Sequence, residues 1–188
     1  MYPETGGSAS RFLFVRYYCG MDYQAKIKAP FGVLGIRCSE DALTGIDFLP
    51  ASEKPQRASS AFARTVCEQL LRYLENPGVR FSVPLASGGT PHQQKVWQAM
   101  LNIPRGETRS YGELAAELKS AAQAVGQACG ANPIPIIIPC HRVVSKSGLG
   151  GFMRHASGAS LDIKRWLLAH EDAALAPSPI GGGLGRGK

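Results

Sequence analysis

The sequence contains no hydrophobic run long enough to cross a membrane. A membrane-spanning helix needs about 20 consecutive apolar residues, and the most apolar early stretch, residues 12–19, is interrupted by Arg16 and preceded by Arg11. That stretch is also too short and too charged to resemble a signal peptide. We therefore expect a cytoplasmic protein without a membrane partner.

The cysteines lack the spacing that metal sites and disulfide frameworks require. Their number is odd and no Cys-x-x-Cys pair occurs, which argues against a zinc ribbon and favours a reducing compartment. Neither Cys19 and Cys38 nor His92 has the spacing of a metal-ligand set, so we expect no metal and no cofactor. The five positions are Cys19, Cys38, Cys67, Cys129 and Cys140.

Positive charge exceeds negative charge, and the excess is concentrated in the second half. The chain of 188 residues has a net charge of +7, and residues 91–171 contain nine Lys and Arg against five Asp and Glu, compared with ten against eight in residues 1–90. A basic surface favours a polyanionic partner such as nucleic acid. Because 44% of the residues are hydrophobic, the chain can form one ordinary domain or two small ones.

The first half predicts a small α+β unit at residues 24–87, after an extension at residues 1–23 that we expect to be poorly ordered. Alternation in residues 26–50 predicts two strands joined by a turn. Apolar residues recur every fourth position in residues 59–76 and predict a helix that ends before Pro77-Gly78. Residues 79–85 are expected to form a third strand. This half contains no chemical motif, and the chain contains no repeats.

The second half predicts a mostly helical domain at residues 91–171, followed by a Gly- and Pro-rich tail at residues 172–188 that we expect to be disordered. Ser110 and Glu113 have the spacing of a capping box and start a short helix that ends near Leu118. A second short helix follows at residues 121–130. Two short helices around a tight turn predict a helix-turn-helix.

The helix at residues 121–130 contains no Arg, Lys or Asn. It offers Gln123 and Gln127 among alanines and glycine, which argues against sequence-specific reading of base edges. Small residues would allow close approach to a DNA groove, with affinity from phosphates and shape. Tight packing in a protein core explains the same composition equally well.

The chemistry of the chain concentrates at Cys140-His141, directly after the proline-rich segment at residues 132–139. A cysteine becomes a strong nucleophile as a thiolate, and a neighbouring histidine can produce one near neutral pH. The prolines predict a stiff extended segment that holds the sulfur in place. The alternative is a buried structural cysteine. Glu171 could orient the imidazole, or be a solvated acid at a helix end, and Tyr111 could simply pack.

Four segments, SYGELAAEL, AVGQACGANPIPIIIPCHRVV, GGF and IKRWLLAHE, together resemble the methylated-DNA–protein-cysteine methyltransferases, which are DNA repair alkyltransferases. The resemblance covers residues 26–171 and is most specific from Thr90 onward. It implies an α+β fold, with a ribonuclease-H-like N-terminal domain and a C-terminal domain that carries a winged-helix-like helix-turn-helix.

The resemblance also implies roles for particular residues. Cys140 would be held as the acceptor thiolate, with His141 taking its proton through a bridging water and Glu171 orienting His141. Asn132 would join the recognition helix to the active-site segment, and Tyr111 would donate toward the leaving guanine. The backbone carbonyls of Cys140 and Val143 would read the guanine amino group.

The implied activity is direct and irreversible transfer of an alkyl group from 6-O-alkylguanine, with 4-O-methylthymine as a further substrate, so that one molecule repairs one lesion. The lesion lies inside the duplex and must be flipped out. The implied partner is double-stranded DNA, bound without sequence preference in the minor groove by a monomer, and associated with the nucleoid in a prokaryote. The residues expected at the DNA are Gln123, Ala124, Gln127, Ala128 and Arg142.

The sequence departs from the family pattern at two places. Gln123 occupies the position where the family usually has an arginine finger that fills the gap left by the flipped base, so we expect weaker DNA binding and flipping. The loop at residues 150–160 is longer than usual, and Ser157 and Ser160 are both candidates for its substrate contact. Gln123 leaves open a lesion-binding sensor without efficient transfer, and Cys140-His141 alone leaves open a cysteine hydrolase.

Overall fold

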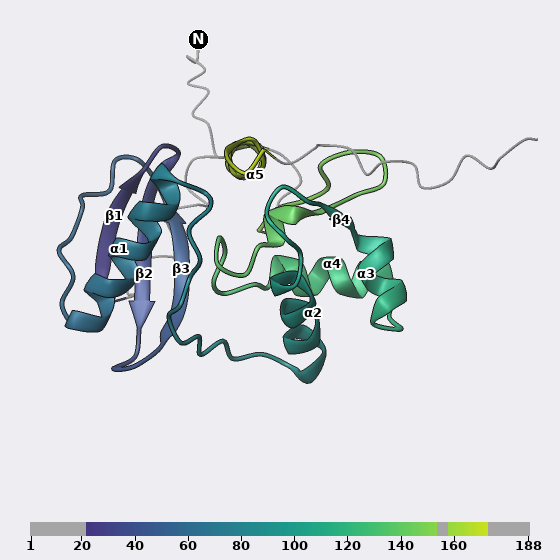
Figure 1. Cartoon of the computed structure of the whole chain (residues 1–188), viewed down its shortest axis with the longest axis horizontal. Coiled ribbons are helices and arrows are strands. Elements are labelled where there is room, and N and C mark those ends of the chain that lie inside the picture. Colours follow the sequence, from purple (N-terminus) through teal and green to yellow (C-terminus); the bar gives the residue numbers. More distant parts are fainter. Residues whose placement is uncertain (1–21, 154–157, 173–188) are drawn as a thin grey trace, which may run out of the picture.

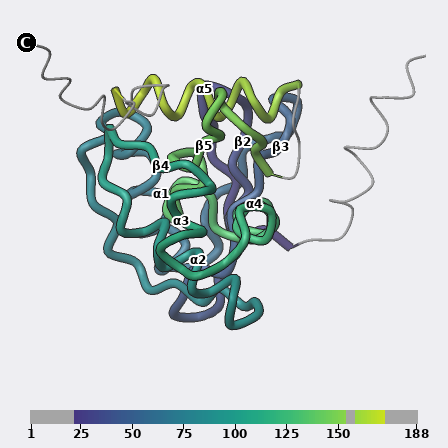
Figure 2. The backbone as a smooth tube through the Cα atoms, turned by 90° about the vertical axis from the view of Figure 1, so that its right-hand side faces the viewer, coloured from purple at the N-terminus to yellow at the C-terminus, as the bar shows by residue number. Residues whose placement is uncertain are grey.

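A computed structural model describes residues 22–153 and 158–172. In it, a sheet unit and a helical unit lie side by side, and helix α5 (Ala159–His170) crosses above them (Figures 1 and 2). The fold is thus mixed α/β, in line with the expected class. None of the described helices is long and apolar enough to cross a membrane. The expectations for residues 1–21 and 173–188 and for Ser157 lie outside the described residues.

The sheet unit consists of three antiparallel strands, β1 (Ala25–Ala29), β2 (Gly32–Cys38) and β3 (Leu43–Leu49), in that spatial order. The expected hairpin is the β2–β3 pair, whereas β1 was not expected. The segment at residues 79–85 is not a third strand, because only Leu85 forms an isolated bridge, to Leu43. Tyr23, assigned to the extension, is buried against Gly35.

Helix α1 (Ala61–Glu75) covers one face of the sheet. Ser60 caps its first turn, since its side chain accepts a hydrogen bond from the N–H of Ala63 at 3.0 Å. Val66, Leu70 and Tyr73 lie on its buried face. This agrees with the helix predicted for residues 59–76, and the repeat of three to four residues explains why one side is apolar.

The helical unit begins with α2 (Pro91–Leu101), which starts with a Thr90 cap and a proline at its first position. The predicted helix pair is present as α3 (Tyr111–Glu117) and α4 (Ala122–Gly130). The predicted capping box at α3 is also confirmed, because the side chains and backbones of Ser110 and Glu113 bond reciprocally. Trp97 of α2 donates to the carbonyl of Ala128 at 2.9 Å and fixes α4 against α2.

The segment at residues 132–139 is a compact turn rather than the expected extended strut. The N–H of Ile138 donates to the carbonyl of Ile134 at 2.9 Å, and Ile136 adopts φ 76°, a left-handed conformation that is rare for a β-branched residue. The buried side chain of Asn132 holds this turn, since it accepts from the N–H of Ile134 at 3.0 Å and donates to the carbonyl of Ile138 at 2.7 Å. The prolines exclude a regular helix in this segment. The hydrogen bonds of the Asn132 side chain favour a turn over an extended backbone.

The two units share a continuous core, so the turn at residues 132–139 is held from both sides. The N–H of Ile46 in β3 donates to the carbonyl of Pro133 in the turn at 2.9 Å. The ring centroids of Phe48 and Phe152 lie 5.7 Å apart, and those of Phe31 and Trp166 of α5 lie 5.1 Å apart. The turn that precedes Cys140 therefore packs directly on the sheet unit.

Candidate active site

Cys140 starts a short 3-10 helix, η1 (Cys140–Arg142), immediately after the turn. Its N–H donates to the carbonyl of Ile138 at 2.8 Å. Strand β5 (Val143–Val144) follows and pairs in parallel with β4 (Arg109–Ser110), which leads into α3. The position of the sulfur is thus fixed by backbone contacts on both sides.

A cavity of about 750 Å³ opens onto Cys140, a size in the range of small-molecule sites. Helix α4 lines one wall, Tyr111 another, and the segment 151–153 a third. The lining residues used below are Tyr111, Gln123, Gln127, Cys129, Cys140 and Gly151. Cys140 is 4% exposed, so the cavity offers the route by which a substrate can reach its sulfur.

Only glycine fits at position 150, beside Tyr111 in the cavity wall. Gly150 adopts φ 68°, and an added Cβ would lie 2.8 Å from a ring carbon of Tyr111. Any side chain there would be strained and would displace the tyrosine. The hydroxyl of Tyr111 donates to the carbonyl of Gly151 at 3.2 Å. Burial, followed by the nearby thiols of Cys129 and Cys140, raises the pKa of Tyr111, so it remains a protonated donor.

His141 follows Cys140 in η1 and pairs with Glu171 away from solvent. Both are buried, and Nε2 of His141 lies 3.0 Å from Oε1 of Glu171. Alignment of the pair is poor, because neither ring nitrogen of His141 has a hydrogen-bond partner of good geometry among the described residues. Burial lowers the pKa of His141 despite the opposing effect of Glu171, and the imidazole is therefore neutral at pH 7.

The resting state of Cys140 differs from the expected thiolate. Burial raises the pKa of the thiol, and the hydrogen bond from Asn132 and the charge of Lys164 offset this only in part. A neutral thiol therefore lies next to a neutral imidazole. Ionisation of the sulfur has to accompany transfer of its proton, since a persistent thiolate would be poorly solvated in this place.

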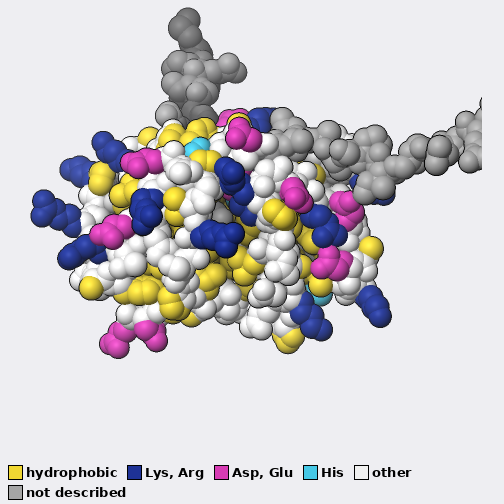
Figure 3. Space-filling view, in the orientation of Figure 1, with side chains coloured by type: hydrophobic (Ala, Val, Ile, Leu, Met, Phe, Trp, Pro, Cys, Tyr) yellow, Lys and Arg dark blue, Asp and Glu magenta, His cyan; other side chains and the backbone are white. Residues whose placement is uncertain are grey.

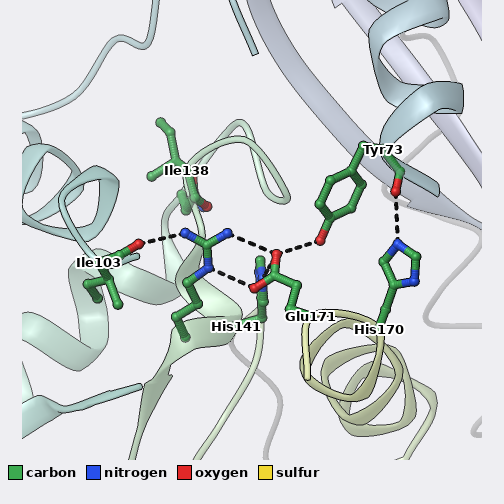
Figure 4. Close-up of polar contacts among 8 residues, drawn as sticks. Tyr73, Ile103, Ile138, His141, His170 and Glu171 are labelled. Carbon is green, nitrogen blue, oxygen red and sulfur yellow. Dashed lines mark hydrogen bonds and ion pairs between the residues drawn. The ribbon is translucent and has the colours of Figure 1, made fainter. Parts of the chain in front are cut away.

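Arg142 binds Glu171 inside the protein (Figure 4). Its Nε and Nη2 donate to the two carboxylate oxygens at 2.8 and 2.9 Å, and Nη1 donates to the carbonyl of Ile103 at 2.6 Å. This bidentate pair is the strong geometry for arginine and a carboxylate. The guanidinium of Arg142, for which a DNA contact was expected, already has its charge neutralised by Glu171.

Glu171 is the residue that ends α5, a position where the helix dipole disfavours a carboxylate. Burial by itself would raise the pKa of Glu171, but His141, Arg142 and Tyr73 together hold it well below its usual range. The hydroxyl of Tyr73 in α1 donates to Oε1 at 2.6 Å. Tyr73 had no signal in the sequence beyond its place on the apolar face of α1.

Lys164 is a second residue that the sequence did not identify. It is fully buried, and its Nζ donates to the carbonyls of Val143 at 2.6 Å, Leu149 at 2.7 Å and Gly151 at 3.0 Å. Burial lowers its pKa to about 8. A usable signal was its spacing from Leu167 and Leu168, which places it on the buried face of α5. It already occupies the Val143 carbonyl that was expected to read guanine.

The remaining predicted residues are divided between surface and interior. Gln123 and Gln127 are exposed and line the cavity, and Ala124 is half-buried beside them. Ala128 is 2% exposed, so its side chain lies in the core instead of on the outer face of α4. Ser160 is buried in the first turn of α5 and is not among the cavity-lining residues. In the view of Figure 3, Lys and Arg are spread over both units.

No group of three or more His, Cys, Asp or Glu side chains that could hold a metal ion occurs within residues 22–153 and 158–172. The second cysteine of the cavity, Cys129, donates to the sulfur of Met100 at 3.5 Å. Burial raises its pKa to about 12. Its two neighbours in the chain, Ala128 and Gly130, carry no base, whereas His141 directly follows Cys140.

Comparisons with known proteins agree with this geometry. The family model described as the DNA binding domain of 6-O-methylguanine DNA methyltransferase matches residues 91–173. The constitutive methylated-DNA–protein-cysteine methyltransferase of Bacillus subtilis is 40% identical over 79% of this chain and 94% of its own length. The Mycobacterium bovis protein of that name is 41% identical over 80% and 93%.

Solved structures give the same result for the fold. The O6-methylguanine methyltransferase of Mycobacterium tuberculosis superposes with a TM-score of 0.68 at 38% identity, covering 81% of this chain and 93% of that one. The M. tuberculosis structure in complex with DNA gives 0.65 at 40% identity, covering 78% and 90%. The chain therefore belongs to the family of methylated-DNA–protein-cysteine methyltransferases.

Proposed function

We propose that the protein repairs DNA by moving the alkyl group of 6-O-alkylguanine onto Cys140 in a single turnover. One observation carries this most directly: the buried Cys140 lines a cavity of about 750 Å³, and the next residue, His141, lies 3.0 Å from Glu171. The family relationship supports the same reaction. We extend the proposal to 4-O-methylthymine, whose alkylated oxygen is chemically similar.

The bond changes follow from the geometry. The Cys140 sulfur forms a bond to the alkyl carbon while the bond from that carbon to the guanine oxygen breaks, and the electron pair of the broken bond goes to guanine. His141 accepts the thiol proton, through a bridging water, as Nδ1 has no partner among the described residues. Tyr111 donates its proton toward the leaving guanine and is restored by the proton that His141 releases through solvent, so the net proton passes from sulfur to base. The thioether product is stable, which makes the reaction a single turnover.

Asn132 and the backbone define the substrate position in this proposal. Asn132 fixes the turn before Cys140 and offsets part of the rise that burial causes in the pKa of the thiol, which supports its role as the hinge between α4 and the active site. The carbonyls of Cys140 and Val143 read the guanine amino group, with Lys164 as an additional partner of the Val143 carbonyl. Ser157 and Ser160 remain proposals for the loop contact.

The α3–α4 pair binds DNA as a helix-turn-helix, with α4 in the minor groove. Small residues and the exposed Gln123 and Gln127 support a contact that depends on shape rather than on base sequence. The base is flipped into the cavity beside α4. We propose a monomer, an N-terminal unit at residues 24–87 of ribonuclease-H type and a DNA-binding unit at residues 91–171 of winged-helix type.

The experiment is to incubate the protein with a duplex that carries labelled 6-O-methylguanine, using Cys140→Ala as the control. The proposal expects one label per protein molecule in the wild type and none in Cys140→Ala. Binding without label would instead indicate a lesion sensor. Turnover beyond one event per molecule would indicate a hydrolase.

Gln123→Arg tests whether the missing arginine finger limits DNA binding. We expect tighter binding to lesion-containing duplex, with the slope of log affinity against log salt steeper by about one. Transfer from free 6-O-benzylguanine should not change, because the base needs no flipping. Binding is measured by fluorescence anisotropy at several salt concentrations.

Gln127→Arg is the matched control, since it adds the same charge one helical turn away on the same exposed face of α4. An arginine finger requires the gain to be larger at position 123 than at position 127. Equal gains would mean that the added charge alone is responsible, and no gain at either position would refute the idea.

A further inference from the structure

The carboxylate of Glu171 receives contacts from three residues on two elements, Tyr73 of α1 and the pair His141 and Arg142 of η1 (Figure 4). Oε1 accepts from the Tyr73 hydroxyl at 2.6 Å and from Arg142 Nη2 at 2.9 Å, and it lies 3.0 Å from His141 Nε2. Oε2 accepts from Arg142 Nε at 2.8 Å. A carboxylate oxygen has two lone pairs, so three donors compete for Oε1. The strength of the contact to His141 therefore depends on the other two.

Tyr73 is the only one of these donors that belongs to the sheet unit. It lies in α1, 98 residues before Glu171, and is 2% exposed. Its backbone is held as well, because Nε2 of His170 donates to the Tyr73 carbonyl at 2.8 Å and the His170 ring stacks on Trp166 at 4.6 Å. Side chain and backbone of one residue thus bind two consecutive residues at the end of α5.

We propose that Tyr73 is a positioning residue for alkyl transfer, acting through Glu171 on His141. This inference rests on the proposed function. Burial, together with the charge of Glu171, raises the pKa of Tyr73, so the phenol remains protonated and always donates. Its hydrogen bond holds the carboxylate in place and lowers the basicity of Oε1. Glu171 then stabilises the imidazolium of His141 without taking its proton.

The charged surroundings determine the direction of the effect. Arg142 and Lys164 oppose a positive charge on His141, Glu171 favours it, and Arg105 acts on Tyr73 from outside. Without the Tyr73 hydroxyl, Oε1 of Glu171 has only Arg142 and His141 as donors. The contact from Glu171 to His141 then strengthens, and the pKa of His141 rises. Less neutral imidazole is available in weak acid to accept the thiol proton.

The test is Tyr73→Phe in the full chain, with Tyr23→Phe as the matched control. Tyr23 is also a buried tyrosine of the sheet unit, but it packs in a separate cluster with Val33 and Leu49. Transfer from free 6-O-benzylguanine is followed by intact mass between about pH 5 and pH 9, the range in which His titrates. For Tyr73→Phe we expect the maximum rate of the pH profile to be about 3- to 15-fold lower, as for one lost hydrogen bond. We also expect the fall in rate on the acid side, the acidic limb, to occur at higher pH.

Two further measurements separate positioning from packing. In a Glu171→Gln background, Tyr73→Phe should displace the acidic limb no further. The pKa of His141, followed by nuclear magnetic resonance of labelled histidine, should rise in Tyr73→Phe and not in Tyr23→Phe. A variant that melts at lower temperature while its acidic limb and His141 pKa coincide with wild type would overturn the inference. Failure of the proposed function can be told apart from failure of this inference, because the wild-type protein would then gain no alkyl mass.

Discussion

Replacement of His141 by alanine should slow transfer from 6-O-benzylguanine by about 100- to 10,000-fold, the range that a positioned proton acceptor contributes. The reason is the state of the sulfur. Burial raises the pKa of Cys140, so the thiol stays protonated until the imidazole takes its proton. Single-turnover rates from intact mass measure the effect. The wild-type rate should fall in acid as His141 gains a proton. Because burial lowers the His141 pKa, this fall should occur at a pH below the ordinary histidine value. The His141→Ala variant should show no such fall.

His92→Ala is the control for this prediction. His92 is half-buried and contacts Ser120 at 2.9 Å, outside the relay, so its removal should leave the rate unchanged. A rate in His141→Ala close to that of wild type would show that the thiol ionises by another route. Such a result would leave His141 as a packing residue.

Glu171→Leu should lower the free energy of unfolding by about 3–5 kcal/mol, the usual effect of removing one partner from a buried ion pair. Arg142 would keep its charge in a half-buried position without a counterion, and the Tyr73 hydroxyl would lose its acceptor. Urea unfolding measures the change. Asp162→Asn, which breaks the exposed pair with Arg165 on the same helix, should cost less than about 1 kcal/mol.

The same carboxylate predicts a pH dependence of stability. The pKa of Glu171 in the folded protein lies below the unfolded value of about 4.3, so its contribution is complete above that value and is lost as the pH falls further. Wild type should therefore lose stability more steeply in acid than Glu171→Gln. Equal acid slopes, or equal costs for Glu171→Leu and Asp162→Asn, would contradict the described ion pair.

The chemistry of the site could be predicted from the sequence better than its geometry. Cys140, His141 and Glu171 were identified from adjacency, from the end of the last helix and from the family resemblance, and they lie together. Tyr73 and Lys164 were missed, because their partners are a carboxylate 98 residues away and three backbone carbonyls. The spacing of Lys164 from Leu167 and Leu168 indicates a buried position, but such long-range partners leave no local pattern.

Elements with strong local signals were placed well, and those set by side-chain bonding were not. The capping box of Ser110 and the apolar repeat of α1 gave correct helices. The prolines of residues 132–139 excluded a helix but could not distinguish extension from a turn, since Asn132 decides this through bonds to Ile134 and Ile138. Strand β1 was missed because it is defined by its antiparallel pairing with β2, a segment later in the chain.

The most direct measurement is the position of the alkyl group after reaction. Protein is incubated with excess duplex containing 6-O-methylguanine and digested, and the peptides that contain Cys140 and Cys129 are compared by mass. Both thiols line the same cavity, but only Cys140 is directly followed by a histidine, His141. We predict one methyl group on the Cys140 peptide and none on the Cys129 peptide. Unmodified Cys140, or methyl divided between the two cysteines, would contradict the mechanism.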